Sequence, residues 1–360
     1  KNLIILGPNR DLNDANATRG AEAIITAASN ASLITIESNV TSYTIDGFNL
    51  VGADYSESNN GRMVWAKGGG TVSTIRNNLI DLTSNASGTK RYIWLGGAGS
   101  VSSGSTYISG QVSHNRFRAF GTGSGFNGLI MMQWSAAFTI SGNKFENLTG
   151  QRNILIWHPT ATTVVENNEF ARVDSNTGDL LWIGGPPPGS APAGPGIVVR
   201  NNKFSNPSSK GVVFFSYGSN VAVTGNDFSG VGGIKIELQS PPASTTINAS
   251  GNWWGTTDGA VISGSTSVTL AGQSLDYTPF LGLGTDTSPG TVGFQPDLAA
   301  VTVTTDKAQV GAIGRVQEGL DLVAAGGTLS LLAGTYTETG ATVKVNNLTI
   351  DAPAGVTGFG

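Results

Sequence analysis

The stretch Val112-Ser-His-Asn-Arg-Phe117 decides the fold, because its pattern returns along most of the chain. A β-branched residue is followed after two spacers by Asn and, two positions later, by Phe. The pattern recurs as ISGNKF (140–145), VENNEF (165–170), VRNNKF (199–204) and VTGNDF (223–228), with looser copies IDGFNL (45–50), IRNNLI (75–80) and NASGNWW (248–254). Internal repetition of this kind indicates an architecture in which each unit packs on the next.

The length of the repeat selects the architecture. The repeated Asn stands at positions 78, 115, 143, 168, 202, 226 and 252, so the spacing falls to 24 residues. Longer gaps hold Gly-rich insertions, such as GGPPPGSAPAGPG (184–196), and a second apolar strand such as RMVWAK (62–67) precedes the copies. A propeller blade needs about 40 residues or more. The period therefore favours an all-β, right-handed parallel β-helix over a propeller or a β-sandwich.

The repeated residue types have structural roles in such a helix. Each coil stacks its strands on the coil below at a spacing of about 4.8 Å. Val, Ile and Phe then form continuous inward columns. The repeated Asn sits at a turn, where its side-chain amide can bond the equivalent Asn above and below. We interpret these Asn residues as a structural ladder.

The composition excludes several classes of partner. Only 12% of the residues are charged, the formal net charge is −4, and the chain has no cluster of Lys and Arg. We therefore expect no nucleic-acid partner. No apolar run approaches the roughly 18 residues that span a bilayer, so we expect no membrane insertion. Cysteine is absent, which excludes disulfides and thiolate chemistry. We expect an extracellular or bacterial cell-surface location.

The one helix signal lies near the C-terminus, in TDKAQVGAIGRVQEGLDLVAAGG (305–327). Thr305 or Asp306 is the expected N-cap, and Gly326-Gly327 is the expected end. Helical spacing places on one face Val310, Ile313, Val316, Leu320 and Val323. We predict a β-helix over 1–285, a linker over 286–300, and a capping segment of helix and strands over 301–360.

Several segments carry a family resemblance: SGNWWGTTDG (250–259), LDYTPFLGLGTDT (275–287), AGTYTE (333–338) and NNLTID (346–351). They resemble bacterial parallel β-helix repeat proteins of the pectate-lyase-like superfamily, in the non-catalytic-looking domains of large secreted or surface proteins. The resemblance implies the order cap helix, GTYTE strand, NLTI-like strand, then coils. This chain starts at NLIILGPN (2–9), and its cap helix and GTYTE strand stand at the far end.

Two interpretations of this order remain open. The C-terminal segment completes the next unit, either in a tandem array or in a neighbouring copy, or it folds back on its own chain. In the first case head-to-tail strand addition would build a fibre or surface layer. The residues expected at that assembly site are Asn2, Leu3, Ile4 and Ile5 at one end and Val345, Leu348 and Ile350 at the other.

Alternation along the strand before each Asn turn predicts a second candidate surface. The expected inward residues are Val64, Ile93, Ile156, Leu181, Phe214 and Ile236. The expected outward column is Trp65, Trp94, Trp157, Trp182, Phe215 and Glu237, with Gln133 in the remaining coil and Tyr217 close by. This column is either covered by another segment or copy, or a platform for sugar rings, or the floor of a catalytic groove. A one-residue slip would reverse the assignment.

The sequence predicts no catalytic residue, metal ligand or cofactor. The Asp-Asp pair and Gly-His-Gly turn of galacturonan hydrolases are absent, and we interpret His114 and His158 as structural. Lys235 and Glu237 are expected to form a salt bridge rather than an acid/base pair. The leading function is therefore an extracellular structural or adhesive protein that assembles with copies of itself. The alternative is a polysaccharide-binding protein, or a polysaccharide lyase or hydrolase, that uses the Trp column.

Overall fold

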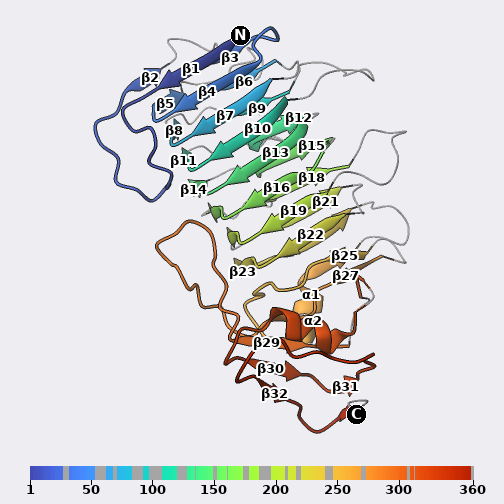
Figure 1. Ribbon diagram of the computed structural model, residues 1–360. Coiled ribbons are helices and arrows are strands. Elements are labelled where there is room, and N and C mark those ends of the chain that lie inside the picture. Colours follow the sequence, from blue (N-terminus) through green and yellow to red (C-terminus); the bar gives the residue numbers. More distant parts are fainter. Residues whose placement is uncertain are drawn as a thin grey trace.

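The computed structural model shows a solenoid of stacked coils that runs from the N-terminus to a smaller C-terminal layer (Figure 1). The structure describes residues 1–26, 32–52, 62–67, 71–82, 92–96, 108–119, 128–133, 135–148, 152–159, 161–172, 178–185, 196–206, 210–215, 220–239, 246–268, 273–305, 309–311 and 313–357.

Three parallel sheets form the walls of the solenoid, and each coil contributes successive strands to them. Sheet A contains, in spatial order, β1 (Asn2–Leu6), β4 (Ser42–Asp46), β7 (Val72–Arg76), β10 (Ile108–Ser113), β13 (Ser135–Ser141), β16 (Thr163–Glu166), β19 (Ile197–Arg200), β22 (Val221–Thr224), β25 (Thr246–Asn248) and β27 (Ser274–Asp276). Sheet B contains β2 (Ile24–Thr26), β5 (Asn49–Gly52), β8 (Leu79–Leu82), β11 (Arg116–Ala119), β14 (Lys144–Leu148), β17 (Glu169–Arg172), β20 (Lys203–Asn206) and β23 (Asp227–Val231). Sheet C contains β3 (Ile34–Ile36), β6 (Val64–Ala66), β9 (Ile93–Leu95), β12 (Gly128–Gln133), β15 (Arg152–Trp157), β18 (Leu181–Gly184), β21 (Val212–Phe215), β24 (Ile236–Gln239) and β26 (Thr266–Val268). The predicted parallel β-helix is confirmed.

The predicted Asn ladder is present at the turn between sheets A and B. From Asn115 to Asn252, each ladder Asn accepts hydrogen bonds from the preceding ladder Asn through its side-chain oxygen. For example, Asn143 donates both its backbone N–H and its Nδ2 to Asn168 Oδ1, at 3.0 Å each. The ladder side chains are fully buried at Asn78, Asn115, Asn143, Asn168, Asn202, Asn226 and Asn252. The ladder thus satisfies polar groups in the interior while it aligns successive coils.

The residue before each ladder Asn has a positive φ, which lets two residues turn the chain from sheet A into sheet B. These residues are Asn77, His114, Gly142, Asn167, Asn201, Gly225 and Gly251, with φ between 52° and 68°, and at the equivalent turn before Phe48 Gly47 has φ of 83°. Gly adopts this left-handed region without strain, and Asn and His occupy it more often than most other residue types do. We call these residues, together with the ladder Asn beside them, the turn column.

The predicted inward columns are continuous. The Phe of the repeat forms a stack in which successive ring centroids lie 4.7 to 4.9 Å apart from Phe117 to Phe228. Trp254 extends the stack at 5.5 Å from Phe228, so the second Trp of NWWG takes the position of Phe in the repeat. Offset stacking adds to the burial of apolar surface.

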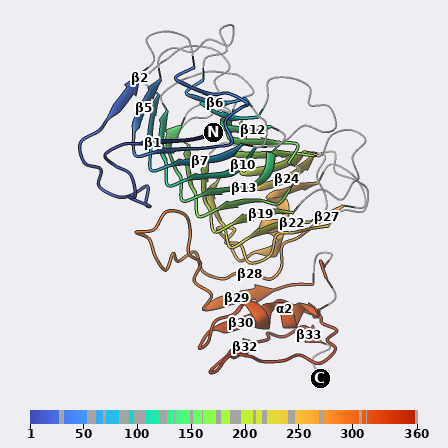
Figure 2. The ribbon, with the colours of Figure 1, turned by 45° about the horizontal axis from the view of Figure 1, so that its top comes forward.

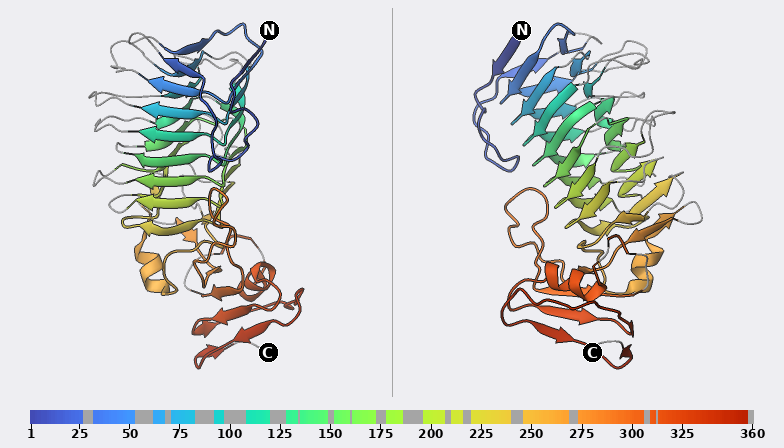
Figure 3. Two further views of the ribbon diagram at one scale, coloured as in Figure 1. Left: turned by 90° about the vertical axis from the view of Figure 1, so that its left-hand side faces the viewer. Right: turned by 45° about the vertical axis from the view of Figure 1, so that its right-hand side comes forward.

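Two loops lie along the outside of the turn column, and they meet. The N-terminal loop (7–23) follows β1, and Asn13 N donates to Asn77 Oδ1 at 2.8 Å. The C-terminal loop (282–299) contains buried Phe294, whose N–H donates to Asn201 O at 2.9 Å. Asn16 Nδ2 donates to Gly290 O at 3.1 Å, so the loops touch although 274 residues separate them (Figure 3). Much of the stretch predicted as a linker is thus packed against the coils.

The C-terminal segment adds further strands below the last coil (Figure 2). Its sheet contains β28 (Phe280–Leu281), β29 (Ala300–Val303), β30 (Thr328–Leu331) and β32 (Thr349–Asp351), and a smaller sheet pairs β31 (Gly334–Thr335) with β33 (Val356–Thr357). The strands β29, β30 and β32 are parallel, as in the coils above. They form a second core with helix α2 (Arg315–Leu322), to which Val301, Leu320 and Leu329 contribute.

The two helices differ from the expectation. Helix α2 begins at Arg315, with Gly314 as its N-cap, rather than near residue 305. Gly311 has φ of +98°, which interrupts the helical pattern, and Ile313 is 49% exposed instead of facing the core. A second helix, α1 (Gly259–Gly264), was not predicted. Its N-cap is Asp258, whose carboxylate accepts from the N–H groups of the first turn.

A buried ion cluster joins the last coil to α2. Arg315 Nη1 donates to Asp276 Oδ1 of β27 at 2.6 Å and to Glu318 Oε2 at 3.1 Å. Asp276 is 2% exposed and Arg315 is 8% exposed. Burial, and then the negative charge of Asp276, raise the pKa of Glu318 to about 7, although Arg315 acts in the opposite direction.

We expect acid to strengthen the packing of α2. Because the pKa of Glu318 is higher in the folded state than in the unfolded state, the folded state binds more protons between about pH 4.5 and 7, and its stability falls as pH rises through this range. After correction for the intrinsic rates of hydrogen exchange, the backbone amides of β29 and β30 should therefore exchange more slowly with solvent at pH 5 than at pH 8. Glu318→Gln should remove this difference. Equal protection of the parent chain at both pH values would contradict the expectation.

Candidate functional site

The outward side of sheet C carries an apolar cluster, which we call the aromatic face. It consists of Trp65, Trp94, Met131, Leu155, Trp157, Trp182 and Val213. The residues predicted to face inward on the same strands lie in the main core, each with no exposed surface: Val64, Ile93, Ile156, Leu181, Phe214 and Ile236. The aromatic residues therefore stand on the outer side of the sheet, as the alternation of the strands requires.

The expected single column is wrong in its register. One row contains Trp65, Trp94, Met131, Leu155, Trp182, Val213 and Glu237. Trp157 belongs to a neighbouring row two residues further along the strands, with Gln133, Gly184, Phe215 and Gln239. The alignment failed because β15 carries two outward apolar residues, Leu155 and Trp157, and short sequence motifs do not say which of them continues the row.

The four Trp residues form two stacked pairs. The Trp65 and Trp94 ring centroids lie 6.1 Å apart, and those of Trp157 and Trp182 lie 4.8 Å apart at 12°. Trp182 lies across Gly184, where a Cβ would come within 2.6 Å of the indole. Gly184 therefore makes room for the second pair.

Guanidinium groups lie over both pairs. The Arg62 guanidinium carbon lies 3.7 Å from the Trp94 ring centroid and 4.2 Å from that of Trp65. Arg152 lies 4.9 Å from the Trp182 centroid. Cation–π contacts of this kind contribute about 0.5–2 kcal/mol each, depending on desolvation. Trp94 and Trp182 are only 6% and 5% exposed, while Trp65 and Trp157 are half-buried. The face is therefore largely closed and offers two separate aromatic patches rather than a continuous strip.

Charged side chains continue the row beyond Val213. Glu237 is 8% exposed, and its carboxylate accepts from Lys210 Nζ and, at 2.7 Å, from Gln239 Nε2. The expected pairing with Lys235 is wrong, because Lys235 Nζ lies near Val231 O, at 3.3 Å. Lys210 comes from the preceding coil, so its approach to Glu237 depends on coil stacking. Asp179 pairs with Arg152 at 3.2 Å on the same face.

The remaining predicted residues of this surface lie at its edge. The β21 backbone places Phe215 beside Gln239, and Tyr217 lies outside the described residues. His158 Nδ1 lies 2.5 Å from Gly185 O, and its ring meets the Trp157 ring edge-on at 4.9 Å. Burial lowers the pKa of His158. Arg62, Arg152, Lys210 and Asp179 were not predicted, and a cation at the start of a Trp-bearing strand is the only sequence signal for the two Arg residues.

The predicted assembly residues occupy the two ends of the solenoid. Strand β1 lies at the edge of sheet A, and its exposed apolar side chains include Ile4 at 68% and Leu3 at 38%. Asn2 is exposed and Ile5 is half-buried. At the other end, β32 is the outermost strand of its sheet, and Ile350 is 38% exposed. Val345 and Leu348 pack against the second core.

A protein-family model described as a right-handed beta helix region matches residues 127–288. The fold of the chain is a right-handed parallel β-helix. The match covers the coils in which the Asn ladder and the Phe stack are most regular. Comparisons with curated proteins and with solved structures gave no match for this β-helix.

Two further findings concern the described part of this β-helix. Its helices are all too short or too polar to cross a membrane. No group of three or more His, Asp or Glu side chains in the described ranges is arranged to hold a metal ion.

Proposed function

We propose that the chain is an extracellular structural module, as in bacterial surface proteins of the pectate-lyase-like superfamily, and that copies of it pair head to tail. The observation that carries this proposal is the matching pair of strand edges at the two ends. An edge strand presents a row of backbone donors and acceptors that can pair with another chain.

The geometry of the two edges is compatible with continuous stacking. Both β1 and β32 belong to parallel sheets. Ile5 faces inward, because it pairs with buried Ile45. Ile350 likewise pairs with buried Leu329. Addition of β1 from one copy to β32 of another, with Ile350 over Ile5, would therefore extend the inward columns across the junction.

Such a contact joins two different surfaces, so a pair of copies still has one free edge at each end. Head-to-tail contacts of this kind build open filaments unless a rotation closes them. The resulting assembly would suit a fibre or an adhesive surface layer.

Light scattering coupled to size exclusion tests the proposal. The mass of the 360-residue chain should rise with concentration. Ile350→Lys and Ile5→Glu should each reduce association at least tenfold, because each places a charge on an inward edge position. The two substitutions combined in one chain should restore part of the association between copies, since opposite charges then meet at every junction. The matched control is Val72→Lys, which changes a 48% exposed Val on β7, an interior strand of sheet A. A monomer at all concentrations would overturn the proposal.

A second candidate is a polysaccharide-binding or polysaccharide-degrading protein. It is favoured by the half-exposed Trp65, which stands beside Arg62 and Lys67, and by the half-exposed Trp157, which stacks on the Trp182 ring that Arg152 covers. The burial of Trp94 and Trp182 counts against a long platform. Calorimetric titration with uronate and neutral polysaccharides separates the two candidates.

A further inference from the structure

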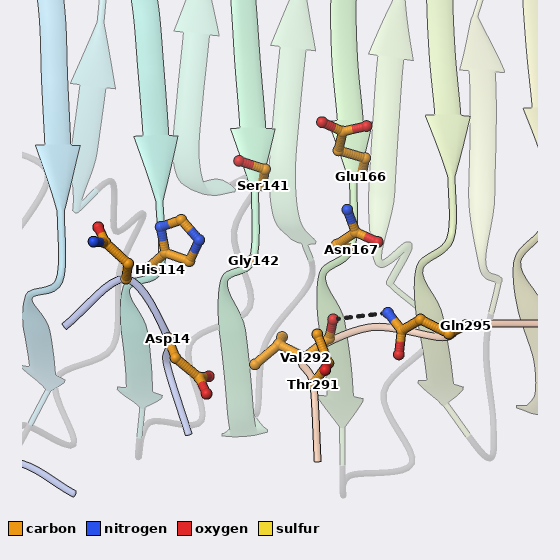
Figure 4. Close-up of a pocket in the computed structure, with 10 residues that line it drawn as sticks. Asp14, His114, Ser141, Gly142, Glu166, Asn167, Thr291, Val292 and Gln295 are labelled. Atoms are coloured by element: carbon orange, nitrogen blue, oxygen red, sulfur yellow. Dashed lines mark hydrogen bonds between the residues drawn. The ribbon is translucent and has the colours of Figure 1, made fainter. Parts of the chain in front are cut away.

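A polar pocket of about 440 Å³ lies on the turn column, and residues of both loops line it together with residues of the coils (Figure 4). Small-molecule sites in proteins commonly have volumes of about 300–1,000 Å³. The coils supply its floor through His114, Gly142 and Asn167. The N-terminal loop supplies Asp14, and the C-terminal loop supplies Gln295. None of these residues belongs to the aromatic face or to the strand edges.

Close backbone approaches shape this pocket. A Cβ on Gly142 would lie 2.7 Å from the imidazole of His114, so the glycine leaves space for that ring. Gly293, with φ of +98°, brings the C-terminal loop so near the coil that a Cβ there would lie 2.6 Å from Asn167 Cα. The contact between Asn16 and Gly290 then holds the two loops together at 3.1 Å.

The described residues of the lining offer hydrogen-bond donors and acceptors but no cation. Its described residues include amides and hydroxyls, for example Asn167 and Ser141, and two carboxylates, but no Lys or Arg. Glu166 already accepts from Arg200, at 2.7 Å. Asp14 Oδ1 accepts from the backbone N–H of Asn16 at 2.8 Å, and its carboxylate has further acceptor capacity. Such a lining disfavours an anion and suits a neutral group with several hydroxyls.

His114 supports a neutral ligand. Burial lowers its pKa, and the positive charge of Arg76 lowers it further while Asp14 raises it. The imidazole is therefore mainly uncharged at pH 7, and it can donate to or accept from a hydroxyl. Its Nδ1 is buried and has no hydrogen-bond partner among the described residues. Nε2 lies on the side of Gly142, which lines the pocket.

We propose that this pocket binds a neutral saccharide unit, whose hydroxyls bond Asp14, His114 and the side-chain amides of Asn167 and Gln295. The ligand would bridge both loops and the coils, so it would tie together parts of the chain that are distant in sequence. This site is independent of head-to-tail pairing and of the aromatic face.

Calorimetry with sugars of matched ring size tests the proposal. The panel contains neutral hexoses and N-acetylhexosamines, with glucuronate and glucosamine as the anionic and cationic counterparts. We expect at least one neutral sugar to bind with a millimolar Kd, and at least tenfold more tightly than either charged sugar. Tightest binding of glucosamine would assign a cation site instead, and tightest binding of glucuronate, or no binding by any neutral sugar, would equally overturn the proposal.

Conservative variants locate the binding. His114→Asn keeps a residue type that already stands at positive φ in the same column, at Asn77 and Asn201. Asp14→Asn keeps an acceptor for the Asn16 N–H. Each should weaken binding at least tenfold without lowering the thermal midpoint of the free chain. His158→Asn is the matched control, because His158 also has positive φ but lies beside the aromatic face. Unchanged affinity in both pocket variants would contradict the assignment.

Discussion

Asn168→Ala is expected to lower the free energy of unfolding by about 3–5 kcal/mol, because it interrupts the Asn ladder in its most regular part. The change leaves the buried Asn143 N–H without its acceptor. It also removes the donor that the Ile140 carbonyl receives at 2.9 Å. Each buried polar group that loses its partner costs about 1–3 kcal/mol. The side chain is fully buried, so water does not replace it without a rearrangement.

Urea denaturation followed by Trp fluorescence measures this effect, because all seven Trp residues precede residue 255 and report on the coils. The control is Asn167→Gly, which changes the adjacent residue at a position where the coils also use Gly142 and Gly225. We expect the control to change stability by less than about 1 kcal/mol, since Gly adopts positive φ without strain. Equal effects of the two variants would mean that the ladder amide contributes nothing specific.

Arg315→Met is expected to release the C-terminal segment from the last coil. It leaves Asp276 buried without its cationic partner, and loss of one member of a buried ion pair costs about 3–5 kcal/mol. No Trp lies in the C-terminal segment, so hydrogen exchange of the β29 and β30 amides is the suitable measurement. Their protection should fall by about two orders of magnitude or more, while the Trp-reported stability of the coils changes much less.

The double variant Arg315→Met with Asp276→Asn distinguishes charge from packing. In the parent chain the Val310 N–H donates to Asp276 Oδ2 at 2.7 Å, and Asn at position 276 keeps an acceptor for it. Because position 276 then carries no uncompensated charge, the double variant should regain at least half of the lost protection. Protection that stays as low as in the single variant would show that the packing of the Arg side chain, rather than charge, holds α2 in place.

The repeated pattern of β-branched residue, Asn and Phe determined the parallel β-helix, its Asn ladder and its Phe stack. These features follow from the sequence because every copy places the same residue type at the same point of the coil. Contacts in the ladder and in the stack join equivalent residues of successive coils. One copy of the repeat, such as Val112–Phe117, therefore predicts the surroundings of the other copies. The amphipathic spacing of Val316, Leu320 and Val323 predicted the buried face of α2 in the same way.

Features that join unlike segments were decided by the tertiary structure alone. The row of Trp157 depends on which residues of β15 and β18 pair. Lys210 meets Glu237 only because one coil stacks on the next. The pocket brings Asp14 and Gln295 to His114 from loops far apart in sequence. Local sequence patterns reveal the period of a coil. They do not reveal how close two loops lie when both fold onto the turn column.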